Sequence, residues 1–218
     1  MDSIQRSKVS SNSPTCIIDS IDDKYFSVSL ENFETFNAEA KRVFEYIKQF
    51  VSNESERKGL FLCGNVGSGK THLAVGAIKK LPEVYANSST YAPTNEILDF
   101  YRAQRCRFLP VRDFMDGMIG FGAQSFITNM LSYDAILLDD LTPLQLDTRP
   151  RIEAIFALID GCYRKNRRLF ITSNFMLEEF STFDSRITSR IAEMCDLVVF
   201  KGADYRLKKL RKSEDKSS

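Results

Sequence analysis

Histidine is almost missing from this chain, which has 218 residues and one histidine, His72. Nucleophilic mechanisms that pair a serine or cysteine with histidine need the imidazole as base. The composition therefore excludes every such mechanism that uses a histidine other than His72. His72 directly follows a glycine-rich segment, where we expect it to pack or to cap rather than to catalyse.

Closely spaced cysteines are also lacking. The chain has five cysteines, and no pair has the Cys-x-x-Cys spacing. Zinc sites use such pairs, and disulfide frameworks use even numbers in small secreted domains. The sequence instead predicts buried, reduced thiols at Cys16, Cys63, Cys106, Cys162 and Cys195.

Long apolar runs and an excess of one charge sign are the remaining absences. No apolar run approaches the roughly 20 residues that span a bilayer. The first residues, MDSIQRSKVSSNSP, are polar and unlike a signal peptide. We therefore expect a cytoplasmic protein without a membrane partner. The formal net charge is +1, so any surface for nucleic acid must be local.

Strand and helix patterns alternate along most of the chain, which predicts an α/β fold with a parallel five-stranded sheet between helices. Residues 1–28 lack a steady period and are interpreted as a flexible N-terminal arm, 29–207 as one domain, and 208–218 as a basic polar tail. The expected strands are the apolar runs at 59–63, 108–111, 135–139, 169–172 and 197–200. The main expected helices are 37–51, 70–80, 150–163 and 185–194, with one or two more within 113–130.

A complete phosphate-binding motif follows the first of these strands. Glycines let backbone N–H groups curl around an anion, and the helix that follows adds its positive N-terminus. Lys70 can reach the β- and γ-phosphates of ATP, and the Thr71 hydroxyl can ligate Mg²⁺. A glycine-rich turn that binds nothing is disfavoured, because every position matches. The predicted site is Gly64, Asn65, Val66, Gly67, Ser68, Gly69, Lys70 and Thr71, with His72 next to it.

Two acidic residues end the strand at 135–139. Asp139 is expected to hold the water shell of the Mg²⁺, and Asp140 to polarise the attacking water. Many ATPases carry the longer Glu at the second position, so Asp140 predicts slow hydrolysis. An acidic turn without a catalytic role is the alternative.

The strand at 169–172 is followed by Asn174, and the last helix carries two arginines. Asn174 is a candidate to orient the lytic water or to contact the γ-phosphate, and a capping role is equally open. Arg190 is our candidate for an arginine that reaches the γ-phosphate of a neighbouring subunit. Arg186 is the reserve, and the alternative is that both are solvated surface arginines.

These motifs, in this order, resemble the AAA+ ATPases, and within them the clade of DnaA initiators and DnaC-type helicase loaders. The resemblance covers residues 30 to about 207. GNVGSGKTHLA looks like the phosphate loop of that clade, and ILLDDL like its Walker B strand. SLENFETFNAEAKRVFEYI is similar to the segment that packs near the adenine. IDGCYRKNRRLFITSNF and SRITSRIAEMCDLVVFKGADYR are similar to the loader pattern in particular.

The resemblance implies an ATPase that acts as a DNA replication helicase loader or initiator-like factor, with a replicative helicase as partner and self-association through Arg190. The short N-terminal arm departs from loaders, which carry a larger helicase-binding domain. Only 18 residues follow Phe200, so little or no C-terminal lid is expected. The alternatives are a transposition helper of the IstB type with a transposase partner, a regulatory ATP-binding module with little turnover, and an unrelated P-loop kinase.

Single-stranded DNA is a possible further partner. The resemblance implies that a helical element within Asp113–Met130 lines a DNA channel, and its aromatic side chains could stack on bases. That segment has no Lys or Arg, so core packing is favoured there. The tail is a better candidate for contacts with phosphates, although a charged chain end is commonly just solvated. The candidate residues run from Lys201 to Lys212, which includes the start of the tail: Lys201, Arg206, Lys208, Lys209, Arg211 and Lys212.

Overall fold

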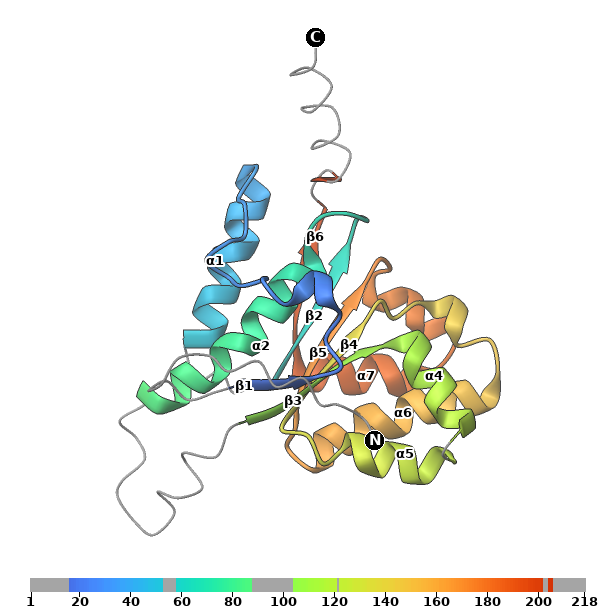
Figure 1. Ribbon diagram of the computed structural model, residues 1–218. Helices are drawn as coiled ribbons and strands as arrows, with labels where there is room; N and C mark the ends of the chain where they lie inside the picture. The colour runs from blue at the N-terminus through green and yellow to red at the C-terminus, as the bar shows by residue number, and fades with distance from the viewer. Residues whose placement is uncertain (1–15, 53–57, 88–103, 121, 202–203, 206–218) are drawn as a thin grey trace.

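A parallel sheet forms the centre of the computed structural model, which describes residues 16–52, 58–87, 104–120, 122–201 and 204–205. The α/β fold with a parallel sheet is confirmed, but the sheet has six strands and not five (Figure 1). Their order across the sheet is β1-β3-β4-β5-β2-β6. The strands are β1 (Cys16–Asp19), β2 (Gly59–Gly64), β3 (Gln104–Pro110), β4 (Ala135–Asp139), β5 (Arg168–Ser173) and β6 (Cys195–Phe200).

The additional strand is β1, which lies within the residues expected to form a flexible arm. It pairs with β3 from Cys16 opposite Gln104 to Asp19 opposite Arg107. The Tyr133 hydroxyl donates a hydrogen bond to Asp19 Oδ2 over 2.8 Å. A 3-10 helix, η1 (Asp23–Tyr25), follows. Four residues are too few to show a period in the sequence, so only the pairing with β3 reveals that this part of the arm belongs to the domain.

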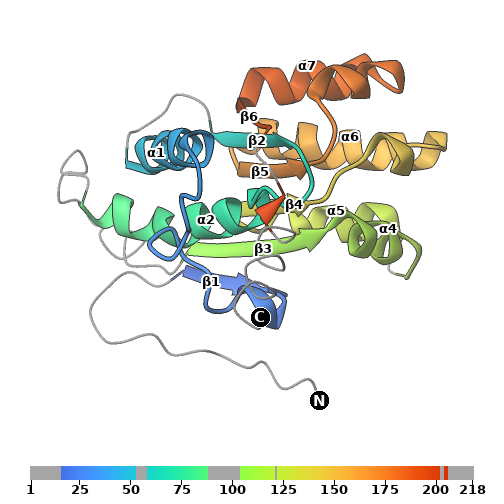
Figure 2. The ribbon, with the colours of Figure 1, turned by 90° about the horizontal axis from the view of Figure 1, so that it is seen from above.

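Helices cover both faces of the sheet, as a buried parallel sheet requires. Figures 1 and 2 show α1 and α2 on one face and α4 to α7 on the other. The helices are α1 (Ala38–Ser52), α2 (Lys70–Asn87), α4 (Val111–Gly120), α5 (Ala123–Met130), α6 (Arg149–Arg164) and α7 (Ser185–Met194). Two further 3-10 helices are η2 (Pro143–Gln145) and η3 (Leu177–Thr182).

The two faces bury separate apolar cores, and β2 contributes to both. Leu60 and Leu62 pack with α1 and α2, whereas Phe61 and Cys63 pack with the helices of the other face. Every residue of β2 is buried, so the strand that leads into the phosphate loop is held rigidly from both sides.

The segment 113–130 belongs to α4 and α5, and two of its aromatic residues pack in or against the core. Phe114 is fully buried, and Phe126 packs against the same cluster. Phe121, the third aromatic residue of the segment, lies outside the described residues. Core packing is therefore the role of Phe114 and Phe126, as the lack of basic residues indicated.

Four of the described cysteines are buried and form no disulfide, as predicted: Cys63, Cys106, Cys162 and Cys195. Burial raises the pKa of the Cys63 thiol to about 11 and that of Cys162 to about 12. Both side chains are therefore neutral thiols at physiological pH and are poor nucleophiles.

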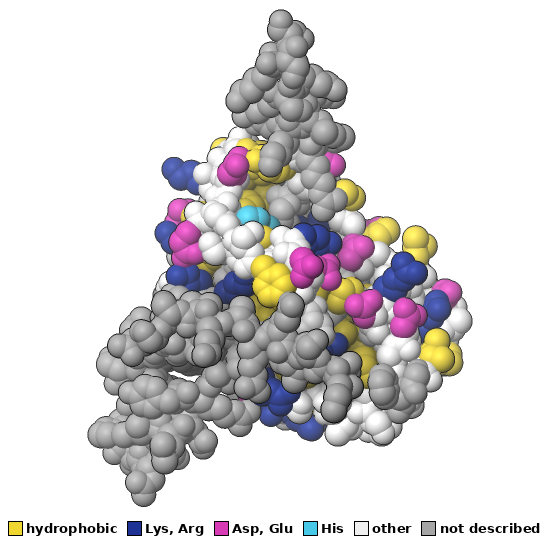
Figure 3. All heavy atoms as spheres, in the orientation of Figure 1, with side chains coloured by type: hydrophobic (Ala, Val, Ile, Leu, Met, Phe, Trp, Pro, Cys, Tyr) yellow, Lys and Arg dark blue, Asp and Glu magenta, His cyan; other side chains and the backbone are white. Residues whose placement is uncertain are grey.

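The surface carries both charge signs side by side. On the face drawn in Figure 3, acidic and basic side chains of the described residues are interspersed, in keeping with the formal net charge of +1. None of the helices in the described ranges combines the length and apolar character needed to cross a membrane. The predicted tail, residues 208–218, and any lid lie outside the described residues.

Candidate nucleotide-binding site

The phosphate loop connects the end of β2 at Gly64 to the start of α2 at Lys70. Gly64 has a φ of 123° and Gly67 a φ of 71°, which L-residues with a side chain rarely adopt. A Cβ at Gly64 would also strike the Phe200 carbonyl of β6. Of the loop's other members, Val66 is exposed and Ser68 is buried. The loop thus has the curled backbone that its glycines predict.

Lys70 is the first residue of α2, its ammonium bonds the carbonyls of the loop, and it is only 6% exposed. Its Nζ donates hydrogen bonds to Gly64 O at 3.0 Å, Asn65 O at 2.7 Å and Asn174 Oδ1 at 2.8 Å. A buried ammonium group needs such partners. The same group can exchange them for the charged oxygens of a nucleotide, which form stronger hydrogen bonds than neutral acceptors.

Thr71 and Asp139 meet beside the loop, although 68 positions separate them in the chain. The Thr71 hydroxyl donates to Asp139 Oδ1 over 2.8 Å, and the Thr172 hydroxyl donates to the same oxygen over 2.7 Å. Burial raises the pKa of Asp139, while these two hydroxyls act in the opposite direction. A hydroxyl next to a carboxylate is the kind of oxygen set that Mg²⁺ prefers alongside phosphates, so these residues fit that ion.

Asp140 and Asn174 complete the polar cluster. Asp140 has a φ of 60°, a conformation that Asp and Asn tolerate better than most residues. Asn174 Nδ2 donates to Asp140 Oδ1 over 3.0 Å, while its oxygen accepts from Lys70. The Asn174 side chain therefore links the phosphate-loop lysine to the second acid.

The strand order explains why these side chains converge. β5 lies between β2 and β4, and the carboxyl ends of parallel strands share one edge of the sheet. β2 leads into the phosphate loop, β4 ends at Asp139, and Asn174 directly follows β5. Thr172 belongs to the same edge, although the sequence analysis did not select it as a site residue. Its position just before Ser173 and Asn174 was the sequence feature that could have indicated it.

His72, which was predicted as a member of the set, has a side chain that binds away from the loop. Its Nε2 lies 3.0 Å from Ser29 O and 3.0 Å from Asn32 Oδ1, and its ring meets the edge of Phe33. Burial lowers its pKa, which favours the neutral imidazole. The side chain therefore fastens the segment before α1, which is the packing role expected of it and not contact with phosphate.

Aromatic residues that the motif analysis missed border the loop. Phe33 lies against Gly69 and stacks on Phe44 with ring centroids 5.9 Å apart. Phe36 and Tyr205 lie 5.1 Å apart, and Tyr205 N donates to Gly67 O over 3.1 Å. The sequence signal for Phe33, Phe36 and Phe44 was that SLENFETFNAEAKRVFEYI resembles a segment that packs near adenine. Flat apolar rings beside a phosphate loop suit a nucleobase.

The two arginines of α7 are both paired within their own chain. Arg190 forms ion pairs with Asp160 at 3.1 Å and Glu193 at 2.7 Å, and its guanidinium lies 4.0 Å from the centre of the Tyr163 ring.

Arg186 is bound in the same manner. It pairs with Asp184 and Glu153 and lies over Phe156. Neither arginine is a solitary solvated side chain, and the partners of both belong to the α6–α7 layer and not to the cluster around Lys70.

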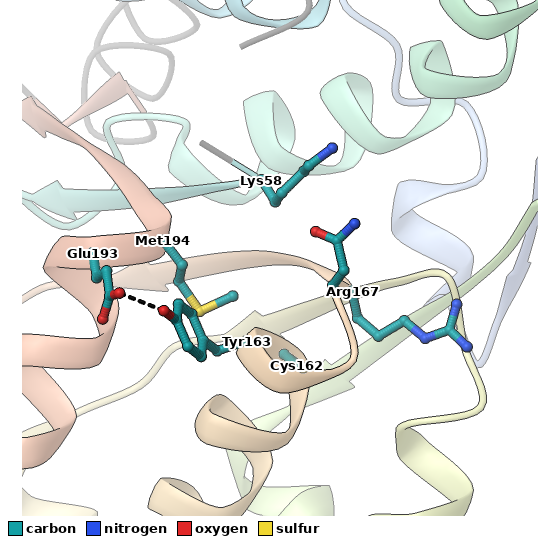
Figure 4. Close-up of a pocket in the computed structure, with 7 residues that line it drawn as sticks. Lys58, Cys162, Tyr163, Arg167, Glu193 and Met194 are labelled. Atoms are coloured by element: carbon teal, nitrogen blue, oxygen red, sulfur yellow. Dashed lines mark hydrogen bonds between the residues drawn. The ribbon is translucent and has the colours of Figure 1, made fainter. Parts of the chain in front are cut away.

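A separate hollow of about 160 Å³ lies at the opposite end of the strands (Figure 4). Lys58, which lines it, directly precedes β2, whereas the phosphate loop follows β2. The hollow is smaller than the roughly 300–1,000 Å³ of typical ligand pockets, so it is no alternative site for a nucleotide. Its lining is Lys58, Cys162, Tyr163, Asn166, Arg167, Glu193 and Met194.

Comparisons with known proteins agree with this geometry. The family described as "Bacterial DnaA ATPAse domain" matches residues 29–196. Among curated proteins, the phage-like element PBSX protein XkdC of Bacillus subtilis is 25% identical over 80% of this chain and 66% of its own length.

Solved structures share the fold. The crystal structure of the DnaC helicase loader is 25% identical, with a TM-score of 0.63, over 83% of this chain and 100% of that one. The replication initiator DnaA bound to AMPPCP and single-stranded DNA is 22% identical, with a TM-score of 0.63, over 91% of this chain and 56% of that one. This chain therefore spans only part of the initiator and about two thirds of XkdC.

Proposed function

This chain belongs to the bacterial DnaA ATPase domain family, within the DnaA/DnaC clade of AAA+ ATPases, and from that premise we propose that it is an ATP-controlled helicase loader or initiator-like factor of DNA replication. Its bound nucleotide is ATP with Mg²⁺, and its partner is a replicative helicase. The solved structure of the DnaC helicase loader, to which this chain is 25% identical, supports the loader role.

The observation that carries the proposal is the continuous set of contacts around Lys70. Lys70, Asn174 and Asp140 are joined by two hydrogen bonds of 2.8 and 3.0 Å, so Asn174 links the residue that would meet the γ-phosphate to the one that would orient the lytic water. Such a link lets the presence of a γ-phosphate change the position of the second acid, which is what a nucleotide-controlled switch requires.

Mg²⁺ would be held by Thr71 and, through its water shell, by Asp139, and when bound it neutralises charge on the β- and γ-phosphates. Asp140 would orient the attacking water. Its side chain is one methylene shorter than Glu and also bonds Asn174, so we propose slow turnover. A slow ATPase acts as a timer for assembly and not as a motor.

Self-association is proposed to place Arg190 against the γ-phosphate of a neighbouring subunit. Arg190→Ala is expected to leave ATP binding within about twofold, but to lower hydrolysis at high protein concentration by at least about tenfold, because an arginine finger acts on the transition state. Hydrolysis rates as a function of protein concentration, with light scattering to measure the size of the assembly, test this prediction.

Arg186→Ala is the matched control, because Arg186 has a similar ring contact and two similar ion pairs. If only Arg186→Ala slows hydrolysis, Arg186 is the finger.

The partner is tested by size-exclusion chromatography of the full chain mixed with the replicative helicase of its own organism, with and without Mg·ATP. Co-elution that depends on Mg·ATP is the expected result. Separate elution under both conditions would contradict the loader proposal. The same assay with a transposase then tests the IstB-like alternative, and ATP-independent binding that survives Asp139→Asn would favour a regulatory module.

Single-stranded DNA is a further proposed ligand, since the related initiator DnaA has been solved with it. The packing of Phe114 and Phe126 in the core leaves the basic residues after Asp204 as the better candidates. All of these lie outside the described residues, and their positive charge is what supports this contact.

A further inference from the structure

Thr172 is a buried polar residue of β5 that lies between Asp139 and Asp140. It is not part of any motif that the sequence analysis used. Its side chain is only 2% exposed. The hydroxyl donates to Asp139 Oδ1 over 2.7 Å and accepts from the backbone N–H of Asp140 over 2.9 Å. A hydroxyl has one proton to donate and lone pairs to accept with, so this single group bonds both acids at once.

The neighbouring strands explain why this hydroxyl is needed. The regular pairing of β4 with β5 ends at Leu138 opposite Ile171, so the ladder does not continue to Asp139. On its other side Asp139 lies opposite Pro110 of β3, and a proline has no N–H to donate. Thr172 continues the connection through its side chain and also through its carbonyl, which accepts from Leu141 N over 2.9 Å.

The backbone of Asp140 shows what this connection maintains. Its φ of 60° turns the chain sharply directly after the strand, and a residue held in that region is strained unless its surroundings stabilise it. The bond from Asp140 N to the Thr172 hydroxyl is such support. The turn brings the Asp140 carboxylate to Asn174 instead of continuing along the strand.

We propose that Thr172 is a positioning residue for the ATPase reaction, whose hydroxyl fixes the carboxylate of Asp139 for Mg²⁺ and the backbone of Asp140 for the lytic water. This inference rests on the proposed function and adds a residue to it. In this proposal Thr172 acts through the two acids and is not itself a ligand of the nucleotide or the metal. Residues that orient a metal-binding group in this way typically contribute about 10- to 100-fold to metal affinity or activity.

The test compares Thr172→Val, which keeps the branched shape and removes the hydroxyl, with Thr172→Ser, which restores the hydroxyl. For the valine variant we expect the Mg²⁺ concentration at half-maximal ATP binding to rise about tenfold and kcat to fall about tenfold. ATP affinity without Mg²⁺ is expected to stay the same. Fluorescence titration of a labelled ATP at varied Mg²⁺ gives the binding values without relying on turnover. The serine variant is expected to stay within about threefold of the natural chain.

Ser173→Ala is the matched control, since Ser173 is equally buried but its hydroxyl bonds the backbone of Leu141 and Phe175 and neither acid. It is expected to lower the melting temperature without shifting the Mg²⁺ midpoint. If Thr172→Val behaves like Ser173→Ala, with lower stability and an unchanged Mg²⁺ midpoint and kcat, the role is structural and the inference is wrong. If the natural chain fails to bind Mg·ATP, the proposed function itself is overturned.

Discussion

Lys70→Ala is expected to abolish nucleotide binding, with the Kd for Mg·ATP rising at least about 100-fold. Lys70 is buried, and its ammonium donates three hydrogen bonds, to Gly64 O, Asn65 O and Asn174 Oδ1. A charge-assisted hydrogen bond contributes about 1.5–3 kcal/mol, and about 2.8 kcal/mol corresponds to 100-fold in affinity. Alanine removes the ammonium that donates to Gly64 O, Asn65 O and Asn174 Oδ1 within this cluster.

Equilibrium titration with a fluorescent ATP analogue measures this loss, and a melting curve for each variant shows whether the fold survives. Lys80→Ala is the matched control, because Lys80 is on the same helix but pairs with Glu31 at 2.7 Å on the surface. It is expected to bind ATP like the natural chain. An unchanged Kd in Lys70→Ala would mean that the phosphate loop is not the nucleotide site.

Asp140→Asn is expected to slow ATP hydrolysis about 100-fold and to leave ATP binding within about threefold. A carboxylate that polarises water contributes roughly 10²–10⁴-fold to the rate, and an amide cannot replace it. Asparagine is the informative replacement because it tolerates the φ of 60° seen at Asp140. Alanine would mix the loss of the acid with backbone strain.

Single-turnover hydrolysis of radiolabelled ATP, with protein in excess over nucleotide, separates the chemical step from product release. Asp113→Asn is the control, since Asp113 is an exposed acid on α4 and is expected to leave the rate unchanged. If Asp140→Asn hydrolyses ATP as fast as the natural chain, another group must polarise the attacking water. If the variant loses its affinity for ATP, Asp140 serves nucleotide binding instead.

Local sequence patterns were enough to predict the residues of the candidate site, but they did not predict where the sheet begins in the chain. The glycines of the phosphate loop, Lys70 and Thr71 could be assigned because one contiguous segment carries both the curled backbone and the cation. The strand 135–139 and the helix 185–194 were predicted with the limits that the structure has, because the strand is a continuous apolar run and the helix has apolar residues three and four positions apart. The short β1 was missed, since its two isoleucines form no period and its place in the sheet depends on β3.

The contacts of three predicted residues, His72, Arg186 and Arg190, could be found only from the tertiary structure. His72 was grouped with the nucleotide because it follows Thr71, yet a helix turns about 100° per residue, and its side chain bonds Ser29 and Asn32 instead. The sequence does not indicate that Arg186 and Arg190 of α7 form ion pairs with carboxylates of α6.

By itself the sequence determined the phosphate loop, the two acids after an apolar strand and the alternation of strands and helices, because each of these is written within about ten consecutive residues. The tertiary structure alone decided that β5 lies between β2 and β4. That order brings Asn174 between Lys70 and Asp140 and places the Thr172 hydroxyl between the two acids. Residues separated by about 100 positions meet there because parallel strands share one edge, and no local pattern records which strands are neighbours.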